Sequence, residues 1–215
     1  MKPNITNTSQ SLIINSYYGY SCLEKKRLDV NNEIEKKFNA QYLMNVLTGI
    51  SKTLDTNILH TSQHSFVPSG TSLSSIIESN EAVFGSSGVM HLNESHISFH
   101  SYYENSIQNI VIVRLELHIS SCSRKSVYLA LNNLSDNHLF NGYDAITLDF
   151  FHRGINLMDS HDNYEIINSF IEEKSKDYNI EINDVSKKFS HYKILRKKDK
   201  IKLKELSEYI YKHLI

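Results

Sequence analysis

The segment IVIVRLELHIS, residues 110–120, limits the possible folds more than any other part of the sequence. Successive side chains of a β-strand point to opposite faces of its sheet, so an alternation of apolar and polar residues predicts a strand with one buried face. Val113, Leu115, Leu117 and Ile119 would share the buried face. Arg114, Glu116 and His118 would share the opposite one.

Other segments surround this strand with further strands and with helices. Alternation predicts strands at 11–21, 57–66, 71–79, 89–102 and 144–151, with a turn at 68–70. Helical spacing predicts helices from Ala40, capped by Asn39, and at 126–134, 163–174 and 200–215. The polar segment 27–39 predicts a loop with a helical turn, and 104–108 another loop. Strands in hairpin-like succession with separate helices predict an α+β fold, an antiparallel sheet with helices packed on one face. Without a repeat or a linker, residues 1–215 are predicted to form one domain.

Composition narrows the class of protein. Hydrophobic residues make up 40% of the 215 residues, enough for a real core. The net charge of −1 gives no electrostatic reason to expect nucleic acid or an anionic membrane as a partner. The apolar runs are far shorter than the roughly 20 residues of a membrane span. The first residues lack the pattern of a secretory signal, so we expect a cytoplasmic protein. The two cysteines form no C-x-x-C pair, which excludes a zinc ribbon and thioredoxin chemistry.

The run HLNESHISFHSYYE, residues 91–104, holds a serine, acids and three histidines. A serine is a poor nucleophile unless a base stands beside it. His100 is five residues after Ser95, so on a strand their side chains leave opposite faces unless a bulge intervenes, which argues against a Ser-His-Asp triad. A metal site built from His91, His96 and His100 would need a convergence that a strand does not provide. Spacing alone leaves two interpretations open, a reactive serine or the polar face of a strand.

The motif ESHISFHSYYE resembles the processing motif (E/K)-S-H-h-x-h-H-T-(Y/W)-P-E of the pyruvoyl-dependent S-adenosylmethionine decarboxylases, where h is apolar. VMHLNESHISFH is similar to VAHLDKSHICVH of the enterobacterial-type branch of that family, and RLELHISSCS is similar to RADIEVSTCG without a gap. The resemblance extends over about residues 11–195. It implies the family's two-layer α+β sandwich.

The resemblance also implies that the chain cuts itself between Glu94 and Ser95, giving a β chain of residues 1–94 and an α chain of residues 95–215. In this family the serine hydroxyl attacks the preceding carbonyl, and elimination from the resulting ester leaves a pyruvoyl group. In this chain the pyruvoyl group would come from Ser95. It would form a Schiff base with the substrate amine and act as an electron sink.

Further residues take roles by the same resemblance. Cys122 matches the catalytic cysteine that donates a proton to the substrate, and His100 matches the histidine that serves as acid and base in processing. Glu104 matches the glutamate that contacts the ribose hydroxyls. Ser87 has the offset of a serine that assists processing in shorter members, with a solvated loop serine as the alternative interpretation. Cys22 has no counterpart and is expected to be a buried thiol.

Three residues depart from the family pattern. Tyr103 replaces the proline of the motif, Ser101 the threonine, and Ser123 the glycine after the cysteine. Because proline fixes φ, the segment that holds Glu104 is expected to be less rigid than in relatives.

The activity implied by the resemblance is decarboxylation of S-adenosylmethionine to the aminopropyl donor of spermidine biosynthesis. The resemblance also implies a tetramer of cleaved protomers, and Mg²⁺ as an activator in some relatives; no metal ligands are assigned. Two alternatives stay open. One is a pyruvoyl-dependent decarboxylase of arginine or ornithine on the same scaffold, and the other is a non-catalytic degenerate homologue.

Overall fold

The computed structural model describes residues 9–21, 27–65, 71–79, 95–105, 110–121, 125–135, 142–153, 161–186 and 189–197, together with Lys204 and Glu208. The predicted turn at 68–70 and residues 89–94 of a predicted strand lie outside these ranges. So does the predicted helix at 200–215, except that Lys204 and Glu208 are helical.

The described strands form one eight-stranded sheet with the order β2-β3-β4-β5-β1-β6-β8-β7. Every neighbouring pair is antiparallel. The strands are β1 (Ser9–Ser21), β2 (Thr56–Ser65), β3 (Thr71–Ser79), β4 (Ser95–Asn105), β5 (Ile110–Ser121), β6 (Ala145–Arg153), β7 (Tyr178–Ser186) and β8 (Phe189–Arg196).

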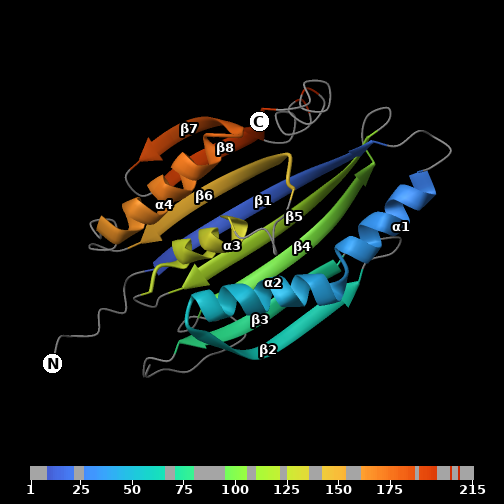
Figure 1. Cartoon of the computed structure of the whole chain (residues 1–215). Helices are drawn as coiled ribbons and strands as arrows, with labels where there is room; N and C mark the ends of the chain where they lie inside the picture. The colour runs from blue at the N-terminus through green and yellow to red at the C-terminus, as the bar shows by residue number, and fades with distance from the viewer. Residues whose placement is uncertain are drawn as a thin grey trace.

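The labelled helices all lie on one face of this sheet (Figure 1). They are α1 (Arg27–Lys37), α2 (Ala40–Thr53), α3 (Leu131–Ser135), which follows the 3₁₀ turn η2 (Val127–Ala130), and α4 (His161–Lys174). The α+β class, the antiparallel sheet and the one-sided helix layer predicted from the sequence are therefore confirmed.

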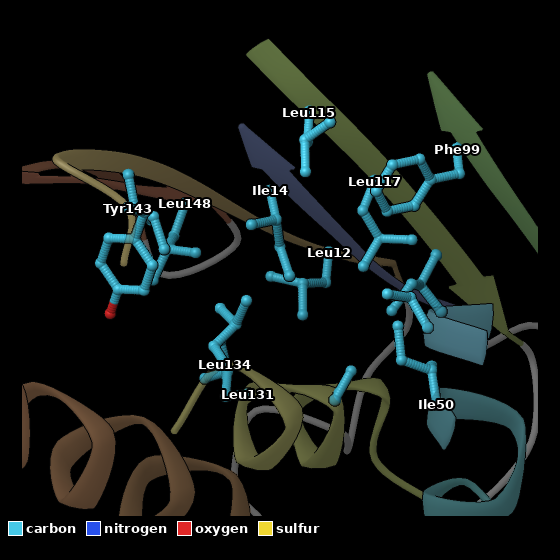
Figure 2. Close-up of a cluster of buried hydrophobic side chains, with 14 of the residues drawn as sticks. Leu12, Ile14, Ile50, Phe99, Leu115, Leu117, Leu131, Leu134, Tyr143 and Leu148 are labelled. Carbon is cyan, nitrogen blue, oxygen red and sulfur yellow. The ribbon is translucent and has the colours of Figure 1, made fainter. Parts of the chain in front are cut away.

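The core fills the space between the sheet and the helices (Figure 2). Leu12 and Ile14 of β1 and Leu115 and Leu117 of β5 are fully buried there, as their alternation predicts. Burying a side chain of this size stabilises the fold by about 1.5–3 kcal/mol. Helix α2 closes the core with Leu43, Val46, Leu47 and Ile50, which share one face at helical spacing.

The N-terminus of α2 is capped as predicted. The side-chain oxygen Oδ1 of Asn39 accepts a hydrogen bond from the backbone N–H of Tyr42 at 2.9 Å. This bond satisfies one of the N–H groups that have no partner inside a helix.

Helix α1 corrects a sequence prediction, because residues 27–37 were expected to be mostly loop. Val30, Ile34 and Phe38 recur every four residues, and Ile34 and Phe38 are buried against the core. The segment is polar overall, yet three apolar residues at this spacing are enough to anchor one face of a helix.

Strands β7 and β8 were not predicted. In β8, His191, Lys193 and Leu195 alternate with Tyr192 and Ile194, a weak version of the pattern of β5. The buried Asp144, just before β6, links this region to the centre of the sheet. Its Oδ2 accepts the N–H of Gly19 at 2.9 Å, and its backbone oxygen accepts the N–H of Arg196 at 2.9 Å.

Candidate active site

The start of β4 and the end of β5 lie side by side. Ser95 is the first residue of β4 and pairs with Ile77 of β3, and the next residue, His96, pairs with Ser120 of β5. Since β5 ends at Ser121, the predicted cleavage position lies beside the end of the strand that leads directly into Cys122. Cys122 itself lies outside the described residues, as do Glu94, Ser87 and Cys22.

The face of the sheet opposite the helices carries polar side chains from β4 and β5. Ile97 and Phe99 of β4 are fully buried toward the helices, whereas His96 and His100 are half-buried on the other side. The pairing of β4 with β5 runs without a shift from His96 to Asn105, so the alternation is regular throughout. We call this surface the polar face; its members on these two strands are His96, Ser98, His100, Tyr102, Arg114, Glu116, His118 and Ser120.

The register separates residues that the sequence analysis assigned to one site. No bulge interrupts β4, so positions 95 and 100 belong to opposite faces of the strand. At about 3.4 Å per residue, five residues separate Ser95 from His100 by about 17 Å, and nine residues separate it from Glu104 by about 30 Å. Within one chain, therefore, neither His100 nor Glu104 is adjacent to Ser95.

The loop predicted at 104–108 begins later than expected. β4 continues through Asn105, with Tyr103 paired to Val113 and Glu104 to Ile112. Tyrosine favours a strand, and unlike proline it keeps the N–H that a ladder needs. The departure of Tyr103 from the family motif thus coincides with an extended strand.

His100 lies within a network of charged and aromatic groups. It stands opposite Glu116 in the register, and its ring stacks on Tyr102 with 6.0 Å between centroids and an interplanar angle of 23°. The guanidinium of Arg114 lies 4.3 Å from the centroid of the Tyr102 ring and 3.5 Å from the Glu116 carboxylate. An anion and a cation therefore both act close to the imidazole of His100.

His118 is a second histidine of this network, and no role was assigned to it from the sequence. Its ring meets that of His96 edge to face, with 5.7 Å between centroids. Burial lowers the pKa of His118; the Glu116 carboxylate opposes this shift and His100 adds to it. Neutral His118 is thus favoured close to His100.

The polar face continues on β6 and β8 with groups that sequence reasoning missed. Nδ1 of His191 lies 2.6 Å from Oδ1 of Asp149, and the amine of Lys193 lies 3.9 Å from Glu181. The hydroxyl of Thr147 is buried and, among the residues that the structure describes, has no hydrogen-bond partner. Alternation in β8 indicates that His191 and Lys193 share a face, but that this is the face of His100 follows from the pairing register.

Two features are absent from the described part of the chain. No helix there combines the length and apolar character of a membrane span. Nor is any group of three or more His, Cys, Asp or Glu side chains in these ranges arranged to hold a metal ion.

Comparisons with known proteins bear on the family. No family model matches the chain. It is 28% identical over 213 residues to the S-adenosylmethionine decarboxylase proenzyme of Hahella chejuensis, which covers 89% of this chain and 80% of the relative. It is also 28% identical over 214 residues to the protein of the same name from Alcanivorax borkumensis, covering 89% of this chain and 76% of the relative. The resemblance recognised from the motifs is confirmed by these relatives.

One solved structure is also similar. The crystal structure of the adenosylmethionine decarboxylase from Aquifex aeolicus is 16% identical and covers 69% of this chain and 92% of that one, with a TM-score of 0.39.

Proposed function

We propose that this chain, a homologue of the S-adenosylmethionine decarboxylase proenzymes, cuts itself between Glu94 and Ser95 and then decarboxylates S-adenosylmethionine. The observation that carries the proposal is the similarity to curated proenzymes over 89% of the chain. The product would be the aminopropyl donor of spermidine synthesis.

The position of Ser95 fits a chain break. The bond that would be cut lies immediately before the first residue of β4, so the pairing of β4 with β3 and β5 from His96 onward would remain. The new N-terminus would sit next to the end of β5. A pyruvoyl group at position 95, when formed, supplies an electron sink for loss of carbon dioxide from an α-amino acid.

The strand order would hold the two fragments together after the cut. β1, β2 and β3 belong to the fragment 1–94, and β4 to β8 belong to the fragment 95–215. β1 lies between β5 and β6, and β3 pairs with β4, so strands of the two fragments interleave. Separation would require breaking the middle of the sheet. We therefore expect the fragments to copurify until they are denatured.

The chain's own residues would then divide the proton transfers. The hydroxyl of Ser95 attacks the carbonyl of Glu94, and the imidazole of His100 takes a proton as the resulting ester opens and releases the Glu94 carboxylate. Water then replaces the nitrogen of residue 95, which leaves as ammonia, and the ketone of the pyruvoyl group remains. The thiol of Cys122 would deliver a proton to the substrate α-carbon; an ordinary thiol, with a pKa of about 8.5, is mostly protonated at neutral pH. Glu104 would accept hydrogen bonds from the ribose hydroxyls, and Ser87 is a further candidate in processing.

The distance of about 17 Å between Ser95 and His100 favours an oligomer in these steps. In the proposed assembly of cleaved protomers, His100 and Glu104 of one copy would serve the Ser95 end of another. Coexpression of Ser95→Ala and His100→Ala chains tests this arrangement. Each is inactive alone, and a shared site predicts that cleavage returns in the His100→Ala chain. If mixed chains stay uncut although they coassemble, His100 acts within its own chain.

Substrate preference is tested by carbon dioxide release from purified protein. We expect release from S-adenosylmethionine and none from arginine or ornithine, and a Cys122→Ala variant that cleaves itself but turns over slowly. Release from a basic amino acid alone would favour the second decarboxylase. An uncut chain without turnover would favour a non-catalytic homologue. Adding Mg²⁺ to the same assay tests the proposed activation by this ion.

A further inference from the structure

His118 occupies a special position on the polar face. It pairs with Ser98, so it lies diagonally between His96 and His100 of the neighbouring strand. Diagonal neighbours on one face of a sheet are about 7 Å apart, within reach of long or aromatic side chains. The rings of His96 and His118 are in contact, so the diagonal distance is bridged on the His96 side.

The charged groups around this position are few. β5 itself contributes Glu116, next to His118 on the same face and opposite His100, and Arg114 beyond it. β1 presents the apolar Ile13 directly opposite His118. One strand further away, Asp149 of β6 pairs with Ile13, and its carboxylate is hydrogen-bonded to the ring of His191. On the far side of β4, the β3 positions in register with His100, Ser98 and His96 are Ser72, Ser74 and Ile76, none of which titrates. One strand further, His64 and His60 of β2 pair with Ser72 and Ile76 and lie two strands from β4.

Electrostatic influence between two histidines is reciprocal. If a proton on His100 disfavours a proton on His118, then a proton on His118 disfavours one on His100 to the same degree. Burial lowers the pKa of His118, so this side chain is neutral where an exposed histidine would begin to charge. A neutral His118 adds no charge repulsion to a proton on His100.

We propose that His118 is a positioning residue for self-processing: from its diagonal position beside His100 on the polar face, its charge sets the pH range in which His100 can act as acid and base. The effect on self-processing rests on the proposed function. The electrostatic coupling between His118 and His100 does not depend on that function.

A charge series at position 118 tests the coupling without requiring activity. In the full-length Ser95→Ala chain, which cannot cut itself, the imidazole C–H resonance of His100 is followed by NMR from pH 4.5 to 8.5. His118→Lys should lower the pKa of His100 and His118→Glu should raise it, with His118→Gln between them. From Coulomb energies at about 7 Å we expect a span of about one pH unit.

A matched control places the same charges far away on the polar face. Asn183 of β7 is exposed, shares this face and lies five strands from β4, about 24 Å at the spacing of neighbouring strands. Asn183→Lys and Asn183→Glu should leave the pKa of His100 unchanged, since that distance exceeds the screening length. Equal titration of His100 throughout the position-118 series, or an equal shift from position 183, would overturn the proposal.

The same variants with Ser95 intact give the functional consequence. The pH at which the self-cleavage rate is half-maximal should move down in His118→Lys and up in His118→Glu, following the NMR order. A merely structural role would lower the rate of all three variants without ordering their midpoints. If the wild-type chain is not cut at all, the proposed function fails, whereas the NMR titration still decides the coupling.

Discussion

The two faces of the sheet differ in the chemistry of their side chains. On the helix-covered face, Leu12, Phe99 and Leu117 are fully buried among other apolar groups. On the polar face, the adjacent positions of β4 and β5 carry His100 and Glu116. The two sets of residues alternate along the same backbone, so secondary structure cannot explain the difference.

The difference indicates that the helix-covered face mainly stabilises the fold, whereas the polar face carries the groups that could take part in chemistry. An apolar face gains free energy from every residue buried. A face that brings histidines and charged groups close together gives up part of that gain, which is a common property of functional sites. Substitutions on the two faces should therefore have opposite profiles, with large effects on stability on one and on chemistry on the other.

The largest effect on stability is expected at the centre of the helix-covered face. Leu117→Ala removes a fully buried side chain of β5 and should lower the free energy of unfolding by about 2–5 kcal/mol. Its neighbour on the polar face, His118→Ala, should cost less than about 1 kcal/mol. Urea unfolding of the two variants, followed by circular dichroism, measures both. Equal losses of unfolding free energy in the two variants would mean that the two faces contribute equally to stability.

A smaller loss is expected in the helix layer itself. Asn39→Ala removes the capping bond to the backbone of Tyr42 and should cost about 1 kcal/mol. Asn39→Asp, which can still accept that bond, is the control and should lose less than half as much. A cost near zero for Asn39→Ala would show that α2 is held by its buried face alone.

On the polar face, one substitution should be neutral or stabilising. Thr147→Val replaces a buried hydroxyl that has no partner in the described structure with a methyl group of similar size. The free energy of unfolding should stay unchanged or rise by up to about 1 kcal/mol. A loss above about 1 kcal/mol in thermal or urea unfolding would indicate that this hydroxyl is hydrogen-bonded in solution.

The smallest effect concerns the pH dependence of stability. Because the pKa of His118 is lower in the folded chain than its ordinary value near 6.5, the unfolded chain binds more protons below neutrality. The contribution of His118 is present above pH 6.5 and is lost as the pH falls toward the folded pKa. Wild-type stability should therefore decline more steeply from pH 7.5 to 5.5 than that of His118→Gln. Parallel curves would contradict the lowered pKa.

The sequence revealed the strands of the sheet centre because their alternation is strong. β5 and β1 repeat apolar residues at every second position. The cap of α2 and the helical spacing of its apolar residues can both be recognised in the sequence. β7 and β8 were missed because Lys193 is buried and Ile182 exposed, so burial does not follow polarity there. α1 was missed because only a few apolar residues pack it against the core.

For the candidate site, the motif identified the residues but not their separation. The alternation of β4 already predicted that Ser95 and His100 belong to opposite faces. That β4 stays regular to Asn105, and that His118 is diagonal to His100, depends on the pairing register, which a single strand does not encode.

Intact mass spectrometry of the purified full-length chain is the most direct test of the central claim that the backbone breaks before Ser95. We predict two fragments, residues 1–94 and residues 95–215 with a pyruvoyl group in place of the serine, and one uncut chain in Ser95→Ala. A wild-type protein with the single mass of the whole chain, 24.9 kDa, and an ordinary serine at position 95 would contradict it.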